Sequence, residues 1–148
     1  MTNITALTTT DREDWLPLWL AYLDFYESEL SAEQTALTFA RITDQAHPIH
    51  GAIARDEDGR AIGFVHWFTH PATWSAGPYC YLEDLYVAPD VRGGGVGRAL
   101  IATVTDAARS AGASKVYWLT QSHNATARTL YDKVATDTGF VHYEIELT

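Results

Sequence analysis

A glycine-rich loop in the second half of the chain carries the clearest chemical signal. Residues 92–98 read Arg92-Gly93-Gly94-Gly95-Val96-Gly97-Arg98 and lie between an alternating apolar stretch and an alanine-rich helical stretch. Glycine leaves backbone amides uncovered at the N-terminus of a helix, where the helix dipole is positive, and such amides bind phosphate oxygens. The spacing therefore predicts a site for a ligand that carries a pyrophosphate.

Residue details exclude two other nucleotide-binding loops. A P-loop ends in Gly-Lys-Ser/Thr, whose hydroxyl binds magnesium, whereas Gly97 is followed here by Arg98 and Ala99. A dinucleotide-binding loop follows the first strand of its fold and has an acidic residue about twenty positions later. This loop lies past mid-chain, and residues 114–119 contain no acid.

The pattern Arg-x-x-Gly-x-Gly at residues 92–97 resembles the acyl-CoA loop of the GCN5-related N-acetyltransferases. Two later segments are similar to the same family, namely Asn-x-x-Ala-x-x-Leu-Tyr at 124–131 and the Gly-Phe at 139–140. The Leu-Glu-Asp at 82–84 narrows the resemblance to acetyltransferases of diamines, polyamines and free amino acids. Between Tyr131 and the Gly-Phe the chain is longer than is usual in the family, so the final strands are harder to place.

The resemblance implies a mixed α/β fold, the acyl-CoA N-acyltransferase fold, with a mostly antiparallel central sheet whose strands splay apart between flanking helices. It also implies acetyl-CoA as co-substrate, with main-chain groups of the core strand pairing with pantetheine and the loop amides and arginines holding the pyrophosphate. The cofactor-binding residues expected are Leu85, Tyr86, Val87, Arg92, Gly93, Gly94, Gly95, Val96, Gly97, Arg98, Asn124 and Tyr131. The arginine side chains could equally be solvated surface charges.

Tyr131 is the candidate general acid. A phenol beside the sulfur can protonate a leaving thiolate, and the seven-residue spacing from Asn124 matches the family's tyrosine. The alternative is that Leu130 and Tyr131 close the helix onto the sheet as core residues.

Glu83 and Asp84 are the acids expected at the acceptor site. They are adjacent on one strand, so regular alternation would point them to opposite faces, and only one could face the substrate. The resemblance assigns Glu83 to the acceptor ammonium and to proton removal, through water, which leaves Asp84 as a structural or capping acid. Both acids could instead belong to a salt-bridged scaffold.

The end of the first predicted helix, residues 20–27, resembles the acceptor-side helix of diamine acetyltransferases. A cation held between Asp24 and Tyr22 or Tyr26 is physically sensible. The alternative is that these acids form an exposed helix face.

The resemblance and the candidate residues predict acetyl transfer to a primary amine of a small cationic molecule. The alternatives are an enzyme that acetylates protein or peptide amines, and a non-catalytic CoA-binding module. Glu83 and Tyr131 speak against the last, because a pure binding module needs neither.

Bulk composition sets wider limits. A chain of 148 residues is expected to be one domain, residues 1–148, and its net charge of −9 disfavours nucleic acid as a partner. The chain has no apolar run of membrane-spanning length and no signal-like N-terminus, so we expect a cytoplasmic protein with no membrane contact. Cys80 is the single cysteine, which excludes an internal disulfide, and the scattered histidines predict no metal site. We also expect a homodimer.

Two capping patterns predict helices in the first third of the chain. Thr10-x-x-Glu13 predicts a helix that ends near Tyr26, and Pro17 implies that this helix is kinked or starts later. Its aromatic residues Trp15, Trp19, Tyr22 and Tyr26 would share one face. Ser31-x-x-Gln34 predicts a second helix that ends near Ile42.

The remaining elements are predicted from apolar alternation and turn residues. A short first strand is expected at 4–7, a hairpin of strands at 52–55 and 61–69 around Asp58-Gly59, and a core strand ending at Val87. A helix at 97–111, a strand at 116–120, a helix from Asn124 and a final strand after Gly139 complete the order.

Overall fold

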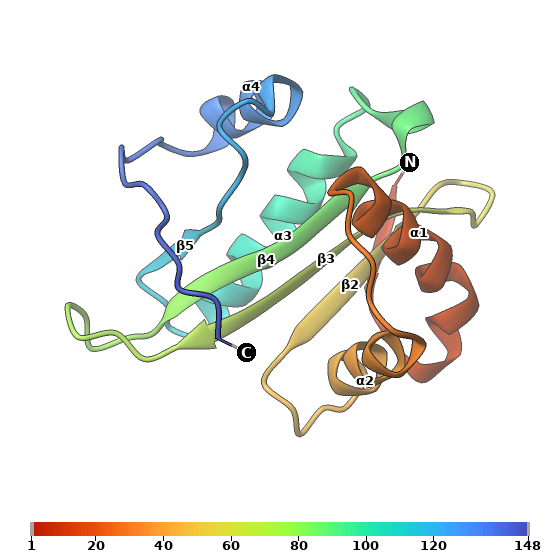
Figure 1. Ribbon diagram of the computed structural model, residues 1–148, viewed down its shortest axis with the longest axis horizontal. Helices are drawn as coiled ribbons and strands as arrows, with labels where there is room; N and C mark the ends of the chain where they lie inside the picture. The colour runs from red at the N-terminus through yellow and green to blue at the C-terminus, as the bar shows by residue number, and fades with distance from the viewer. Residues whose placement is uncertain (1, 148) are drawn as a thin grey trace. The chain divides into compact units, whose positions relative to one another are not determined.

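The structure is a computed structural model that describes residues 2–147, in two compact units that divide between Tyr117 and Trp118 (Figure 1). The first unit contains β1 (Asn3–Ala6), a 3-10 turn (Thr9–Asp11), α1 (Arg12–Phe25), α2 (Ala32–Ile42), β2 (His50–Arg55), β3 (Ala61–His70), β4 (Tyr79–Val87), a second 3-10 turn (Pro89–Val91), α3 (Val96–Ser110) and β5 (Lys115–Tyr117). The second unit contains α4 (Ala125–Val134).

The first unit is built on a five-stranded sheet in the order β1-β2-β3-β4-β5. The first four strands are antiparallel, and β5 runs parallel to β4. The hairpin between β2 and β3 turns at Gly59, whose φ of +83° is a conformation that glycine adopts without strain. The predicted mixed α/β class with a mostly antiparallel sheet is therefore confirmed.

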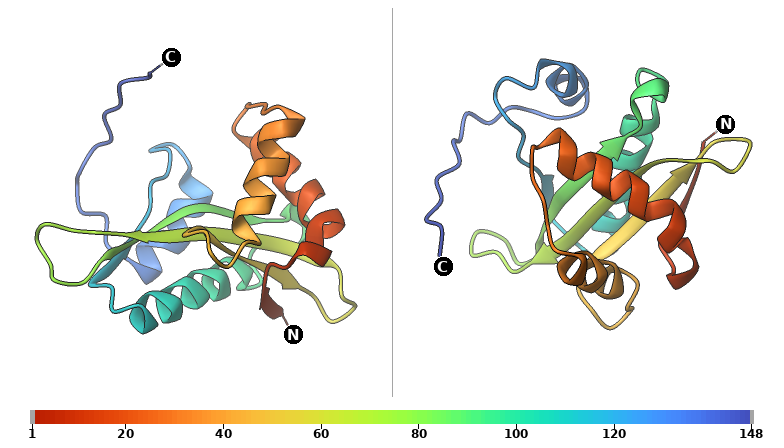
Figure 2. Two further views of the ribbon diagram at one scale, coloured as in Figure 1. Left: turned by 90° about the horizontal axis from the view of Figure 1, so that it is seen from below. Right: turned by 45° about the vertical axis from the view of Figure 1, so that its right-hand side comes forward.

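Helices cover both faces of this sheet, with α1 and α2 on one face and α3 on the other (Figure 2). A Cβ atom added at Gly51 would lie 2.5 Å from Ile42 of α2, and one added at Gly63 would lie 3.3 Å from Leu100 of α3. These two glycines let the helices pack closely against opposite faces.

The α1 side of the sheet has an aromatic core. Trp15 and Trp19 stack with ring centroids 5.4 Å apart, and Trp19 continues the contact to Tyr22 at 5.6 Å. Tyr22 meets Tyr26 edge-on at 5.1 Å. The prediction that these four aromatics share one face of the first helix is confirmed.

The start of α1 differs from its prediction. The capping contact is made by the backbone N–H of Thr8, which donates to Asp11 Oδ2 at 2.8 Å, so the expected capping box at Thr10 and Glu13 is wrong. The upstream pair of Thr8 and Asp11 forms the capping box instead, and a 3-10 turn precedes the helix. Pro17 lies inside α1, so the helix does not start after it.

The second helix follows its prediction, because Ser31 Oγ accepts from the backbone N–H of Gln34 at 3.0 Å. The strand predicted at 116–120 is shorter than expected and ends at Tyr117.

In the second unit, α4 extends to Val134, three residues beyond Tyr131. The final strand predicted after Gly139 does not form within the described residues, although the sequence alternates there. A strand needs a neighbour for its main-chain groups, and this segment pairs with none in the described part of the chain. Its apolar side chains are consequently exposed, with Tyr143 and Leu147 each 89% accessible.

Candidate active site

The glycine-rich loop adopts the geometry expected of an anion-binding helix start. Gly93 and Gly95 each have a φ of +87°, which a side chain would strain. Gly95 is the N-cap of α3, and no side chain caps the helix. The first helical bond within this turn runs from the N–H of Ala99 to the carbonyl of Gly95 at 3.0 Å. The amides at the start of α3 precede that bond, so the loop fits a pyrophosphate.

The strand that leads into this loop has an open edge. The ladder between β4 and β5 joins Tyr79–Tyr81 to Lys115–Tyr117 and then stops. From Leu82 to Val87, β4 has no strand on this side within the described residues. This edge is the place where a pantetheine arm could pair as an additional strand.

Alternation along β4 determines which main-chain groups reach that edge. The N–H of Ala88 donates to the carbonyl of Ile62 beside β3 at 2.8 Å. Since the main-chain groups of successive residues in an antiparallel strand point to opposite sides, those of Leu85 and Val87 face the open edge and those of Tyr86 face β3. Two of the three residues expected to pair with pantetheine are therefore oriented for it, and Tyr86 contributes its side chain to the α1 side instead.

Arg92 has partners within the protein. Its Nε donates to the carbonyl of Val87 at 3.0 Å, and its guanidinium carbon lies 5.7 Å from the ring centre of Tyr86 and 5.9 Å from that of Phe25. Arg92 thus braces the end of β4 against α1. Its contact with a pyrophosphate stays a prediction, as does that of Arg98, which is exposed.

A β-bulge interrupts β4 at Glu83. His66 of β3 pairs with Asp84, whereas the next residue, Trp67, pairs with Leu82, so Glu83 is the additional residue. The side chains of β4 therefore change their alternation at this point. The expectation that Glu83 and Asp84 lie on opposite faces assumed a regular strand, and the bulge removes that basis.

Asp84 lies on the α1 face in a partly buried hydrogen-bond network. Its Oδ1 accepts from the hydroxyl of Tyr22 at 2.8 Å, and its Oδ2 lies 2.9 Å from Nδ1 of His66. The other ring nitrogen of His66 is 3.1 Å from Nε1 of Trp15. The prediction of a structural acid at Asp84 agrees with this arrangement.

Glu83 differs from Asp84 in being exposed at the surface. The surrounding protein still desolvates its carboxyl, and this burial, together with the charge of Asp84, raises the pKa of Glu83 above the ordinary range. A carboxylate with a raised pKa is a stronger base near neutral pH.

Three tyrosines surround the two acids. Burial raises the pKa of Tyr22, and the charge of Asp84 raises it further. Burial also raises the pKa of Tyr26. The pKa of Tyr81 is raised by burial and, next in importance, by the charge of Glu83. These phenols therefore keep their protons, and together with the carboxylates they form a surface suited to an ammonium group.

Asp24 is not brought to this cluster. It is exposed, and two residues of helix rotate it by roughly 200° from Tyr22, which faces Asp84. The predicted cation site between Asp24 and Tyr22 is therefore not assembled, whereas Tyr22 itself lies at the acids.

Two predicted residues lie in the second unit, on α4. Asn124 is the N-cap, and its Oδ1 accepts from the N–H of Ala127 at 3.4 Å. Tyr131 is half-buried and packs edge-on against Trp118, with ring centroids 5.3 Å apart. Asn124 thus caps α4 and Tyr131 packs against Trp118, and the roles of both residues toward CoA stay predictions.

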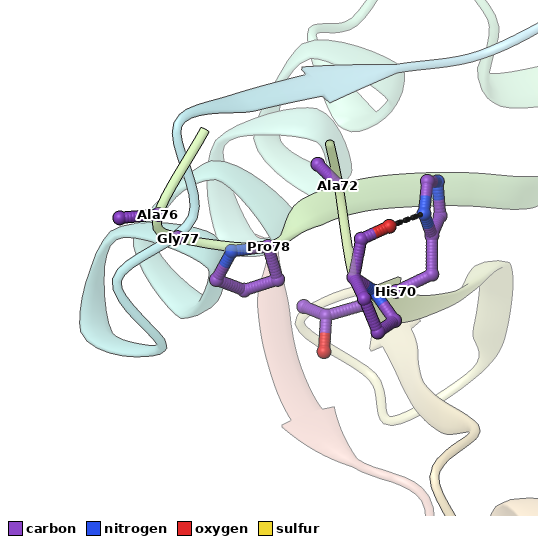
Figure 3. Close-up of a pocket in the computed structure, with 7 residues that line it drawn as sticks. His70, Ala72, Ala76, Gly77 and Pro78 are labelled. Carbon is purple, nitrogen blue, oxygen red and sulfur yellow. Dashed lines mark hydrogen bonds between the residues drawn. The ribbon is translucent and has the colours of Figure 1, made fainter. Parts of the chain in front are cut away.

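A separate hollow of about 370 Å³ lies along the loop between β3 and β4, lined by residues 69–72 and 76–78. Its titratable residue, His70, bonds through Nδ1 to the carbonyl of Pro71 at 2.8 Å (Figure 3) and through Nε2 to the hydroxyl of Tyr117 at 2.7 Å. None of the predicted site residues lines this hollow.

Comparison with known proteins identifies the family of the chain. The family model described as "Acetyltransferase (GNAT) family" matches residues 12–135. The chain belongs to this family and is an acetyl-CoA-dependent N-acetyltransferase.

Individual relatives include a D-amino-acid N-acetyltransferase, HPA3, of Saccharomyces cerevisiae, which is 39% identical over 95% of this chain and 88% of its own length. A thialysine N-epsilon-acetyltransferase of Caenorhabditis elegans is 28% identical over 90% of this chain and 83% of its own. Among solved structures, AAC(6')-Iy in complex with a bisubstrate analog matches with a TM-score of 0.86 at 21% identity, over 100% of this chain and 99% of that one. At that identity the structural likeness shows the fold.

Sequence reasoning did not find the partners of Asp84. The contact between Tyr22 and Asp84 joins residues 62 positions apart, and that between Trp15 and His66 joins residues 51 positions apart. No local pattern signals such pairs. Among residues 2–147, no helix has the length and apolarity to cross a membrane, and no cluster of three metal-ligating side chains occurs.

Proposed function

We propose that this enzyme transfers the acetyl group of acetyl-CoA to a primary amine of a small cationic molecule, polyamine-like or amino-acid-like, by direct attack in a ternary complex. The observation that carries the proposal is the pair of carboxylates at the β4 bulge, beside the open strand edge and among tyrosines. Two relatives whose names give amino-acid substrates support it.

The proposed cofactor site uses main-chain groups. The amides at the start of α3 would hold the pyrophosphate, and pantetheine would pair with the outward-facing groups of Leu85 and with the N–H of Val87, whose carbonyl accepts from Arg92. A main-chain N–H at this edge, directed at the thioester oxygen, would stabilise the negative charge that develops there during attack.

The proposed chemistry needs one base and one acid. Glu83 accepts the proton that the ammonium loses, through water, so that the amine nitrogen can form a bond with the acetyl carbon while the carbon–sulfur bond breaks. Tyr131 then donates its phenolic proton to the leaving thiolate. The adduct nitrogen loses its second proton, through water, to the Tyr131 phenolate, so that the products are the neutral amide, the CoA thiol and the protonated Glu83.

A panel of amines tests the acceptor class. Acetyl-CoA consumption should be efficient with small primary amines that are cationic at neutral pH, and slow with peptides that carry the same amine in a lysine side chain. Efficient acetylation of a peptide, with no acceptance of small amines, would replace this proposal by the peptide-acceptor alternative.

Tyr131→Phe tests the acid. General acids contribute about 10²- to 10⁴-fold, so kcat should fall by that order while CoA binding, followed by calorimetry, is kept. Tyr143→Phe is the matched control, because Tyr143 is an exposed tyrosine of the same unit. A loss of only about twofold in a chemistry-limited assay would contradict the acid role and leave Tyr131 with its packing against Trp118.

We also propose that residues 1–148 act as one domain and form a homodimer. The family match at 12–135 spans both compact units, and the exposed apolar residues at 140–147 offer a surface for association. Sedimentation equilibrium measures the mass directly, and a monomer at high concentration would contradict the dimer.

A further inference from the structure

Asp84 is held from two sides where β4 bulges. His66 of β3 contacts its Oδ2 at 2.9 Å, and the hydroxyl of Tyr22 on α1 donates to its Oδ1 at 2.8 Å. Glu83, the additional residue of the bulge, directly precedes Asp84. The two elements that pack around the bulge thus each supply one hydrogen-bonding group to this carboxylate.

The indole N–H of Trp15 determines where the protons of this network lie. The indole Nε1–H of Trp15 can only donate, and it lies 3.1 Å from Nε2 of His66. Nε2 must therefore accept with its lone pair, which places the single ring proton on Nδ1, facing Asp84. His66 is 1% exposed. As a neutral ring it donates from Nδ1 to Asp84, and the hydrogen bond from Trp15 to Nε2 fixes this tautomer.

We infer that Asp84 is a positioning residue: fixed by His66 and Tyr22, it holds the bulge that presents Glu83 to the acceptor amine and keeps a negative charge beside the Glu83 carboxyl. The inference rests on the proposed function only for the identity of the molecule that Glu83 meets. The relation between Asp84 and Glu83 can be tested on the enzyme alone.

The charges around Glu83 explain why Asp84 has this effect. The titratable groups at this corner of the sheet are Asp84 and Tyr81 of β4, Tyr22 and Tyr26 of α1, His66 of β3, and Arg92 beyond the end of β4. The tyrosines keep their protons and His66 is neutral, while Arg92 is engaged with the carbonyl of Val87. The negative charge that acts on Glu83 therefore comes from Asp84, and it raises the pKa of Glu83 in addition to burial.

Asp84→Asn separates charge from geometry. Its amide oxygen can accept from His66 and its amide nitrogen can donate to the Tyr22 oxygen, so both contacts are kept while the charge is lost. Carboxyl ¹³C NMR of the ligand-free enzyme would follow the titration of Glu83. The midpoint should move to lower pH in Asp84→Asn, and an unchanged midpoint in the folded variant overturns the inference.

Two further variants control this measurement. Asp106→Asn removes an exposed acid on α3 that pairs with Arg109, and it should leave the midpoint of Glu83 unchanged. Tyr22→Phe removes one donor and keeps the charge, so its midpoint should stay closer to the wild type than that of Asp84→Asn. A larger shift in Tyr22→Phe than in Asp84→Asn would contradict the assigned role of the charge.

The wild-type protein supplies a measurement that does not depend on the folding of a variant. ¹⁵N NMR of His66 at pH 8 should show a protonated Nδ1 and an unprotonated Nε2. A proton on Nε2 would break the network that fixes Asp84 and overturn the inference.

Activity separates this inference from the proposed function. In Asp84→Asn the acidic limb of kcat against pH should move to lower pH together with the NMR midpoint, and CoA affinity should be unchanged. If no amine is acetylated but the Glu83 midpoint still falls, the proposed function fails and the role of Asp84 stands. If amines are acetylated and the midpoint does not move, the role of Asp84 fails and the proposed function stands.

Discussion

The glycine-rich loop and the β4 bulge are built in different ways, although one strand leads from one to the other. The loop offers main-chain amides, and its shape depends on glycines within a few residues of one another. The bulge offers side chains, and it depends on partners from β3 and α1 that lie 18 and 62 positions away from Asp84 in the sequence. The proposed cofactor half of the site therefore depends on neighbouring residues of one segment, whereas the proposed acceptor half depends on contacts between distant segments.

This difference affects which of the two regions depends on the acceptor. Backbone amides recognise phosphate oxygens whatever side chains surround them, so a loop of this kind can serve any acceptor. In the proposed function, the acids and tyrosines at the bulge determine which amine is recognised and how basic Glu83 is. Substitutions in the two regions should therefore act on different kinetic parameters.

The largest effect is expected at the acceptor half. Glu83→Gln removes the base and should lower kcat/KM for the amine by about 10²- to 10⁴-fold, with a raised KM for the amine. The dissociation constant of CoA, measured by calorimetry, should be unchanged. A matched control is Glu33→Gln on α2, which alters an exposed acid in the first turn of that helix and should leave both parameters intact.

Gly97→Glu should have the converse effect on the cofactor half. Gly97 is the second residue of α3 and has no positive φ, and an acid in the first helical turn is favourable for the helix, so the fold should be kept. The new carboxylate competes for the amides, and CoA affinity should fall by about 100-fold or more, roughly 2.7 kcal/mol.

Gly97→Ala is the control for that change, because it adds volume without charge and should keep CoA affinity. Unchanged CoA affinity in a folded Gly97→Glu variant would remove the loop from the cofactor site.

The pH dependence sharpens the comparison without any substitution in the loop. Both Glu83 and the amine must lose a proton before attack. The raised pKa of Glu83 therefore places an acidic limb above the usual glutamate range, and an amine with a pKa near that of lysine, about 10.4, adds a further rise toward high pH. Activity should therefore increase with pH, first along the acidic limb of Glu83 and then as the amine loses its proton. Steady-state rates in Glu83→Gln should lose the acidic limb and keep the rise due to the amine.

The smallest expected effect concerns the packing of α3 against the sheet at Gly63. A Cβ atom at Gly63 would lie 2.7 Å from the main-chain oxygen of Tyr86 and 3.3 Å from Leu100 of α3. Gly63→Ala should therefore destabilise the fold by about 1–3 kcal/mol, measured by urea denaturation. A change below the error of the measurement would show that β4 and α3 can yield at this point.

The elements were predictable where the signal was local. Asp58-Gly59 predicted its hairpin and Ser31 its helix start, because a turn or a cap is decided by a few adjacent residues. The final strand after Gly139 was predicted from alternation but does not form, since a strand also requires a partner that alternation cannot specify. The predicted cap of α1 was wrong for a related reason, because Thr8 with Asp11 fits the same pattern as Thr10 with Glu13.

The sequence by itself determined the family, the mixed α/β class and the position of the glycine-rich loop, because glycine and helix-start chemistry act within one segment. It also singled out Glu83 and Asp84 as acids on the core strand. Only the tertiary structure showed that β4 is not a regular strand at these two acids, since that depends on the register with β3 and on one additional residue at Glu83. The same structure separated an exposed Glu83 from an Asp84 bound by Tyr22 and His66, because packing between distant segments sets burial and hydrogen-bond partners.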